Sequence, residues 1–359
     1  MRLLYRLEEN LITICGTGLA GLRIAAELRE RGYDGLLRAI EREGIPPYDR
    51  PPLTKVLFGE YRKPLSAEGL GELSQLCDEV ITANVESLDG TAVVANGTRY
   101  ESDITVLALG ADARNAIGGA LTIRTRDDAA KLRAVEGQVT IVGGGWLGSE
   151  LASSYAEAGR QVNLVEIAED ILPVLGPGAR KVRVALEDLG VKILRQIPDN
   201  PGTLVEATGA IPNTLGLDLT TDGWGRTNMP GVYAVGDCAE ISIGPSSGHW
   251  NTALHQATRV AEAIMTDPHA DPVPLTPDVF STIAGLELLF IGHAAGTPVV
   301  LEDGSRTLWI KDGRLSGGLT IDRPADGVAL RKNIGASLSE EAAADPLPLK
   351  KILRAQQTV

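Results

Sequence analysis

The chain has 359 residues, 43% hydrophobic content and 41 glycines, which allows two or three domains with hydrophobic cores of their own. Its formal net charge of −13 argues against nucleic acid or an anionic membrane as a general partner. No apolar run reaches the roughly 20 residues needed to cross a bilayer, and no secretory signal pattern stands at the N-terminus, so we expect a cytoplasmic protein.

Cysteine and histidine spacing argues against two further kinds of site. The three cysteines, Cys15, Cys77 and Cys238, form neither a C-x-x-C nor a C-x-x-x-x-C pattern, which predicts no disulfide framework and no local redox dithiol. The four histidines show no spacing typical of metal ligands, so no metal site is expected. A disulfide reductase is the least favoured enzyme class, although Cys15 and Cys238 could still meet near a cofactor.

A glycine motif follows the first predicted strand, Leu11–Cys15, and precedes a predicted helix at Leu22–Arg31. A second strand, Leu36–Ile40, ends at Glu41, where a carboxylate can bind a ribose hydroxyl. Strand, glycine turn and helix together form the cradle that holds a dinucleotide pyrophosphate at a helix N-terminus. The motif glycines are Gly16, Gly18 and Gly21.

The segment Ile45–Lys55 carries four prolines, which predict a stiff, non-helical arm. Such an arm would hold Arg50 and Lys55 on a defined path, and a plain surface loop is the alternative interpretation. Beyond it the pattern predicts a hairpin around Asn96-Gly97, a buried strand and a charged helix. These elements span Thr91–Val94, Thr98–Glu101, Ile104–Leu109 and Arg124–Ala134.

A second G-x-G-x-x-G motif lies within Gln138–Glu150 and has the same context as the first. A β-branched strand precedes it, a helix is expected at Ser149–Arg160, and the next strand, Gln161–Val165, ends at Glu166. A carboxylate there binds a ribose hydroxyl and repels a 2′-phosphate, which favours NADH over NADPH. The glycines are Gly143, Gly145 and Gly148.

Two dinucleotide cradles in one chain predict two cofactors that exchange electrons, and a flavin with a nicotinamide is the commonest such pair. One functional site beside one decayed site is the alternative. A later strand, Gly231–Asp237, ends in Gly236-Asp237, whose carboxylate could accept from a ribityl hydroxyl or cap a helix. The helix expected at Asn251–Met265 could direct its N-terminus at a flavin.

The remaining segments predict a helix, a strand, a Pro/Asp-rich linker and then a small antiparallel α+β domain. They span Lys181–Leu189, Leu204–Thr208, His269–Pro277, Leu286–Ile291, Thr297–Leu301, Thr307–Ile310, Arg314–Leu319 and Lys350–Ala355.

At this point the sequence resembles the ferredoxin-reductase-like flavoprotein NADH oxidoreductases. That family includes putidaredoxin, rubredoxin and dioxygenase ferredoxin reductases, with apoptosis-inducing factor as a relative. The likeness runs the length of the chain and is more specific than any glycine loop. The matching segments are GTGLAGLR (Gly16–Arg23), PYDRPPLTK (Pro47–Lys55), RTRDDAAKLR (Arg124–Arg133), GGGWLGSELA (Gly143–Ala152), ATGAIPN, TNMPGVYAVGDCAE, HWNTALHQ, DRP (Asp322–Pro324) and DPLPLKKIL.

The resemblance implies an α/β fold with two Rossmann-like dinucleotide-binding domains and a small C-terminal α+β domain, the NADH domain being inserted in the FAD domain. The implied boundaries are 1–112 and 217–270 for the FAD-binding domain, 113–216 for the NADH-binding domain and 271–359 for the C-terminal domain.

The resemblance also implies the site residues. Lys55 and Glu150 fall where the family places an ion pair near flavin N5, and Trp146 where an aromatic lies by the flavin and nicotinamide rings. The alternative for Lys55 and Glu150 is a purely structural salt bridge, and the alternative for Trp146 is an ordinary surface or core aromatic. The implied FAD contacts are Gly16, Gly18, Gly21, Glu41 (with Arg42 or Glu43 as other alignments), Arg50, Lys55, Arg124, Gly236, Asp237 and Trp250. The implied NADH contacts are Gly143, Gly145, Gly148 and Glu166.

The implied function is an FAD-dependent oxidoreductase that takes hydride from NADH and passes electrons to a small iron–sulfur protein or rubredoxin. The sequence departs from the family near the acceptor side: the segment between Arg195 and Gly202 is short, Gly248 replaces a glutamate, and Phe280-Ser281-Thr282 replaces a Trp and an Asp-Gln pair. Two alternatives therefore stay open. One is a flavoenzyme that reduces a small molecule, quinone or oxygen directly, and the other an NADH-sensing interaction protein. A homodimer is one assembly that the sequence allows.

Overall fold

The computed structural model describes residues 10–59, 64–242 and 248–357 of the chain. The chain divides into two compact units, and each contains several separate segments. Unit 1 consists of Met1–Asp49, Arg62–Asp112 and Ile211–Leu275. Unit 2 consists of Arg50–Tyr61, Ala113–Ala210 and Thr276–Val359.

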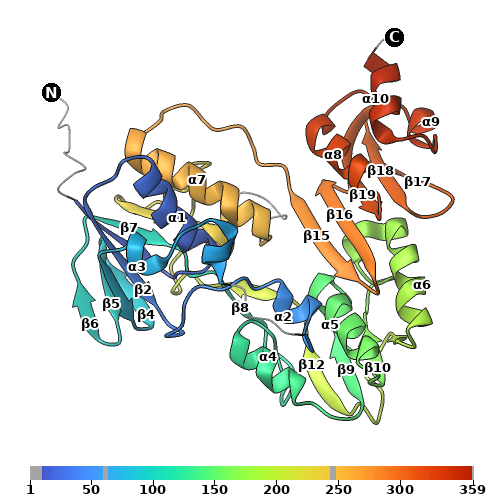
Figure 1. Ribbon diagram of the computed structural model, residues 1–359, viewed down its shortest axis with the longest axis horizontal. Helices are drawn as coiled ribbons and strands as arrows, with labels where there is room; N and C mark the ends of the chain where they lie inside the picture. The colour runs from blue at the N-terminus through green and yellow to red at the C-terminus, as the bar shows by residue number, and fades with distance from the viewer. Residues whose placement is uncertain (1–9, 60–63, 243–247, 358–359) are drawn as a thin grey trace. The chain divides into compact units, whose positions relative to one another are not determined.

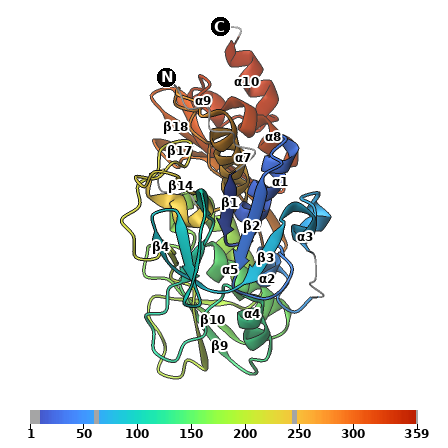
Figure 2. The same ribbon diagram turned by 90° about the vertical axis from the view of Figure 1, so that its left-hand side faces the viewer.

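Unit 1 is built on a five-stranded parallel sheet with the order β14-β7-β1-β2-β3. Figure 2 shows β1, β2 and β3 side by side. The strand order reverses at β1, which has β2 on one side and β7 on the other, and open α/β sheets bind ligands at such a reversal. The bounds are β1 Leu11–Cys15, β2 Leu36–Glu41, β3 Glu79–Thr82, β7 Ile104–Leu107 and β14 Val232–Ala234.

Helices α1 (Leu19–Glu30) and α7 (Trp250–Thr266) pack against each other in unit 1, as Figure 1 shows in blue and orange. Their contact is rich in alanine, for example at Ala25 and Ala257, which lets the two helices approach closely and bury β1. A second cluster joins the strands to a small antiparallel sheet. The other elements of unit 1 are η2 Leu65–Glu68, α3 Leu73–Leu76, β4 Val85–Asp89, β5 Ala92–Ala95, β6 Thr98–Tyr100 and η4 Gly236–Ser242.

Unit 2 begins with a four-stranded parallel sheet in the order β11-β10-β9-β12. Helix α5 (Trp146–Glu157) connects β9 to β10 and completes the second strand–turn–helix unit. The strands are β9 Val139–Val142, β10 Val162–Val165, β11 Lys192–Leu194 and β12 Thr203–Glu206. The other elements are α2 Pro52–Lys55, α4 Arg126–Arg133, η3 Pro173–Ala179 and α6 Arg180–Asp188. Strands β8 Ala111–Ala113 and β13 Ala210–Pro212 each contain a position where the chain passes from one unit to the other.

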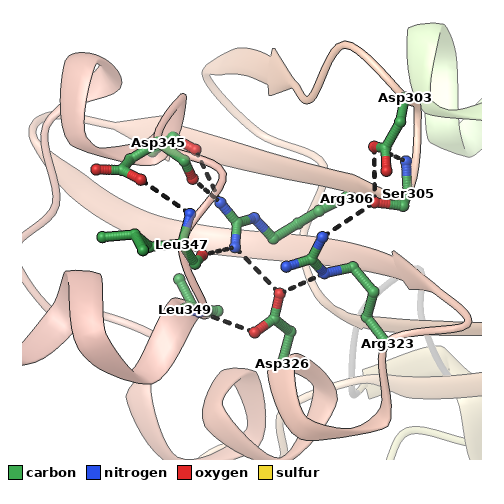
Figure 3. Close-up of polar contacts among 9 residues, drawn as sticks. Asp303, Ser305, Arg306, Arg323, Asp326, Asp345, Leu347 and Leu349 are labelled. Carbon is green, nitrogen blue, oxygen red and sulfur yellow. Dashed lines mark hydrogen bonds and ion pairs between the residues drawn. The ribbon is translucent and has the colours of Figure 1, made fainter.

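The C-terminal part of unit 2 is an antiparallel sheet in the order β15-β16-β19-β18-β17, covered by three helices. Its core includes a fully buried arginine, Arg306, which is drawn with its partners in Figure 3. The bounds are β15 Asp278–Ile283, β16 Leu286–Gly292, β17 Thr297–Val300, β18 Arg306–Lys311, β19 Arg314–Ile321, α8 Pro324–Asn333, α9 Glu340–Ala343 and α10 Leu349–Gln357.

The predicted fold class is confirmed, and the differences are local. The arm expected to be non-helical ends in a helix at Pro52–Lys55, because proline is well suited to the first helical turn. Helix α5 starts at Trp146, three residues before the predicted start. The strand expected over Gly231–Asp237 ends at Ala234, where Gly236 turns the chain with a φ of 74°. The three domain boundaries stay a prediction.

No helix in the described segments is long and apolar enough to cross a membrane. Strands β3 and β15 and helix α8 were not predicted from the sequence.

Candidate functional site

The first glycine loop, in unit 1, uses each of its three glycines differently. Gly16 has a φ of 95°, and a Cβ on it would lie 2.4 Å from the Ala108 carbonyl oxygen. A Cβ on Gly21 would lie 1.9 Å from the Gly16 carbonyl oxygen, so this glycine lets α1 lie against the turn. Gly18, the N-cap of α1, has nothing within 4 Å of a built Cβ and gives the helix no side-chain cap.

The second glycine loop, in unit 2, repeats this geometry. Gly143 has a φ of 107° and approaches the Ala207 carbonyl oxygen, to which a Cβ would come within 2.5 Å. A Cβ on Gly148 would lie 1.8 Å from the Gly143 oxygen, whereas Gly145 again faces open space and caps α5 without a side chain. Two glycines in each loop thus serve packing, and the middle one leaves bare helix N–H groups beside free space. That is what a pyrophosphate requires.

The acid at the end of each second strand is held by its own turn. Both oxygens of Glu166 accept one backbone N–H, from Gly144 at 2.9 Å and from Ala168 at 2.8 Å. A carboxylate has about four acceptor positions, so each Glu166 oxygen can still accept a bond from a ribose hydroxyl.

Glu41 is buried and more fully occupied. One of its oxygens accepts from Glu43 N and Gly44 N, each at 2.8 Å, and the other accepts from the Thr82 hydroxyl at 2.5 Å. Of the residues that could align in its place, Arg42 forms an ion pair with Asp112 at 3.0 Å, while Glu43 accepts from the Tyr48 hydroxyl at 2.8 Å. Glu41 keeps about one acceptor position for a ligand.

The other predicted contacts in unit 1 lie on η4 and α7. Gly236 N donates to the Gln256 side-chain oxygen at 2.8 Å, and the half-buried Asp237 follows in the first turn of η4. Trp250 is the first residue of α7, and its indole N–H donates to Asp49 at 2.9 Å. Gln256 and Asp49 thus hold two elements that the resemblance assigns to the flavin.

Lys55 and Glu150 are brought together in unit 2, with Lys55 Nζ 3.9 Å from Glu150 Oε1. Glu150 is buried, and two hydroxyl groups contact its carboxylate more closely than the lysine does. The Ser281 hydroxyl donates to Oε1 at 2.6 Å and the Thr54 hydroxyl donates to Oε2. Lys55 Nζ donates to the Phe280 carbonyl oxygen at 3.1 Å and lies 4.0 Å from the centre of the Phe280 ring.

Burial raises the pKa of Glu150 above the ordinary glutamate value, while Lys55, Ser281 and Thr54 act to lower it. Burial is the larger effect because an ionised carboxylate loses much of its hydration in this position. The side chain therefore keeps a proton to a higher pH than an exposed glutamate does.

Three further predicted site residues lie in unit 2: Arg50, Arg124 and Trp146. Arg50 donates through Nη1 to the Arg124 carbonyl oxygen at 2.5 Å, which ties the proline arm to the start of α4. Trp146 is half-buried and stands one helical turn before Glu150 on α5. The cofactor roles of all these residues stay predictions.

Sequence reasoning missed three contributors to the Glu150 environment: Thr54, Phe280 and Ser281. Thr54 directly precedes Lys55 in the segment PYDRPPLTK, so the sequence places it next to a predicted site residue. Val279 and Ile283 fall on the same face of the segment Asp278–Ile283 as Ser281, and this spacing favours a strand.

The three cysteines are free and buried. Burial raises the pKa of Cys15 to about 12 and that of Cys77 to about 11, and burial also raises the pKa of Cys238. These thiols stay protonated near neutral pH and are poor nucleophiles. Within the described residues, no group of three His, Cys, Asp or Glu side chains could hold a metal ion.

Comparisons with known proteins identify the family of the chain. A family model described as pyridine nucleotide-disulphide oxidoreductase matches residues 11–197. The chain is 29% identical to a rubredoxin-NAD(+) reductase of Pseudomonas putida, with 78% of this chain and 86% of that protein covered. It is 28% identical to the ferredoxin reductase component of a chlorobenzene dioxygenase from Cupriavidus sp. (strain PS12), covering 96% and 98%. The crystal structure of Fdr9 matches with a TM-score of 0.82 at 28% identity, covering 94% and 98%.

Proposed function

Because the chain belongs to the pyridine nucleotide-disulphide oxidoreductase family and is an FAD-dependent NAD(P)H oxidoreductase, we propose that it takes hydride from NADH and passes electrons to a ferredoxin- or rubredoxin-type protein. The observation that carries the proposal is the pair of matched glycine loops, each with an open middle glycine at an uncapped helix N-terminus. The similar proteins named for rubredoxin and for a dioxygenase ferredoxin support the class of acceptor.

The first loop would hold FAD and the second NADH. The resemblance assigns FAD contacts to Glu41, Asp237 and Trp250, which lie in unit 1, and to Arg50 and Arg124, which lie in unit 2. Glu166 would bind the NADH adenosine ribose and disfavour a 2′-phosphate. Bound FAD supplies a ring that accepts a hydride and releases its electrons singly.

Lys55 and Glu150 form the proposed catalytic pair. A cation held beside the reacting ring stabilises the negative charge that develops on hydride arrival, and a buried site strengthens this effect. Trp146 would form a flat wall that excludes water from the hydride path. The residues of this site would need to supply no general base, because bound FAD would accept a hydride.

Direct reduction of a quinone or oxygen is the second candidate. It is favoured by the partly exposed Phe280, 41% accessible, at a position where the family's Trp is absent. The protonated, buried thiols argue against a third route through a disulfide.

A pair of loop variants tests the cofactor assignment. Gly18 and Gly145 both have backbone angles that other residues adopt and open space beside them, so Gly18→Val and Gly145→Val fold and fill only ligand space. We expect G18V to be isolated without yellow colour, and G145V to keep FAD but lose its reduction by NADH. Each variant is the control for the other. If the two results were reversed, FAD would be assigned to the second loop and NADH to the first.

The acceptor is tested with FAD-loaded wild-type protein and NADH under anaerobic conditions. Cytochrome reduction that requires added rubredoxin or [2Fe–2S] ferredoxin supports the proposal. Fast reoxidation by quinone or oxygen without a carrier supports the second candidate. A long-lived charge-transfer band with a change in oligomer size on gel filtration would instead indicate an NADH-sensing interaction protein.

A further inference from the structure

Two neighbouring residues of β15, Phe280 and Ser281, contact the two members of the proposed catalytic pair separately. The Phe280 carbonyl oxygen and ring hold the Lys55 ammonium, while the Ser281 hydroxyl donates to Glu150 at 2.6 Å. Directly after the strand, Ala284 N donates to the Ser153 hydroxyl on α5 at 2.7 Å. Strand β15 therefore contacts both members of the pair, and the residue that follows it is bonded to α5.

We propose that Ser281 is a positioning residue which, with Thr54, holds the Glu150 carboxylate at a set separation from Lys55 and favours its charged form. The inference deepens the proposed function and rests on it for the role of the pair. It assigns to β15 a part in the hydride step that the family resemblance does not supply.

The donors around the Glu150 carboxylate explain how Ser281 favours its charged form. An ionised carboxylate only accepts, so the single proton of each hydroxyl can be donated to it. Lys55 Nζ, at 3.9 Å, lies beyond ordinary hydrogen-bond distance from Glu150, and the hydroxyls make the close contacts. The separation is set by the Phe280 carbonyl on one side and the Ser281 hydroxyl on the other.

The groups that face Glu150 come from two elements packed on α5. Helix α2 supplies the charged Lys55 and the Thr54 hydroxyl, and β15 supplies the Ser281 hydroxyl. All three favour the charged carboxylate and oppose the effect of burial. Removal of one hydroxyl should therefore make Glu150 easier to protonate.

The first test measures Glu150 protonation without turnover. Infrared spectra of FAD-loaded, NADH-free protein are recorded against pH, with Glu150→Gln as the subtracted reference, and the carboxylic acid carbonyl band is followed. We expect Ser281→Ala to raise the midpoint by about one pH unit, as the loss of one hydrogen bond to a charged group requires. Thr282→Ala, on the exposed face of the same strand, is the matched control and should leave the midpoint unchanged, and Ser281→Thr should restore it.

The second test asks whether Ser281 acts through Glu150. The rate of flavin bleaching by NADH is measured against pH for wild type, S281A, E150Q and the double variant. We expect S281A to shift the pH profile upward by the same amount as the infrared midpoint, and to change nothing in the E150Q background. A shift of equal size in both backgrounds, or an unchanged infrared midpoint, would overturn the inference.

The outcome separates this inference from the proposed function. If wild-type protein takes up FAD and is reduced by NADH while S281A behaves like wild type in both tests, only the role of Ser281 fails. If wild-type protein is not reduced by NADH, the proposed function fails whatever the infrared result. Should S281A not fold, Ser281→Cys, which keeps a side chain of similar length but is a weak donor, carries the same two tests.

Discussion

Unit 2 contains two buried carboxylates paired with cations, and they are held in different ways. In the C-terminal part of unit 2, Asp326 on α8 accepts from Arg306 at 3.0 Å and from Arg323 at 2.7 Å, and its other oxygen accepts from Leu349 N at 2.8 Å. Arg306 also donates to the Leu347 carbonyl oxygen at 2.9 Å and to that of Asp345. Figure 3 shows the Arg306 guanidinium bonded to Asp326, Leu347 and Asp345, while Arg323 and Leu349 bond to the Asp326 carboxylate.

Glu150 is paired with the compact ammonium group of Lys55, whereas Asp326 is paired with the planar guanidinium group of Arg306. Lys55 stays 3.9 Å from Glu150 and is bonded elsewhere, and hydroxyl groups make the short contacts. An arginine with several fixed acceptors fastens chain segments together, whereas a lysine held at a distance leaves a carboxylate whose charge can change. The comparison indicates that the Arg306 cluster holds the C-terminal fold together, and that the Glu150 carboxylate can gain or lose a proton as the pH changes.

The largest effect should come from Asp326→Ala, which leaves the Arg306 guanidinium buried without its carboxylate. We expect a loss of about 3–5 kcal/mol in the free energy of unfolding, measured by urea denaturation, and no change in flavin reduction by NADH per folded molecule. Arg331→Ala is the matched control, since it breaks an exposed ion pair with Asp278 and should cost at most about 1 kcal/mol. An equal loss in both variants would contradict the structural role.

Lys55→Met should show the opposite pattern. We expect the rate of flavin bleaching by NADH in stopped-flow mixing to fall about 100-fold, as when one preorganised stabilising group is removed. The loss of stability should be smaller than in D326A, because Glu150 keeps two hydroxyl donors and can take up a proton. Lys131→Met, which removes an exposed lysine near Asp128, should leave the rate unchanged. A rate loss of equal size there would count against a specific role for Lys55.

The two clusters also differ in how much the sequence could reveal. The glycine loops are local, so strand, turn and helix could be predicted from Gly143, Gly145 and Gly148 with their neighbours. The Lys55–Glu150 pair was inferred from the family resemblance, and the structure brings the two side chains together. Ser281 could not be predicted as a partner, because its contact with Glu150 spans 131 residues and depends on how β15 packs on α5.

Arg306 is the clearest failure of sequence reasoning. It begins the strand Arg306–Lys311, and an arginine at the end of a strand is normally assigned to solvent. Its burial depends on the carbonyl oxygens of Asp345 and Leu347 between α9 and α10, some 40 residues later, which no local pattern encodes. The four prolines of Ile45–Lys55 likewise predict a non-helical arm, yet its last residues form helix α2. Proline disfavours the interior of a helix but suits its first turn.

The smallest predicted effect concerns pH. Because burial places the Glu150 pKa above its ordinary value, its contribution to stability is full below the ordinary glutamate pKa and is lost as the pH rises through the raised value. We therefore expect the stability of wild type relative to E150Q to fall across that window, by up to about 1.4 kcal/mol for each pH unit. Urea denaturation of both proteins between pH 4 and pH 8, roughly the range in which glutamates titrate, measures the difference. A difference between wild type and E150Q that rises with pH would contradict this role of Glu150.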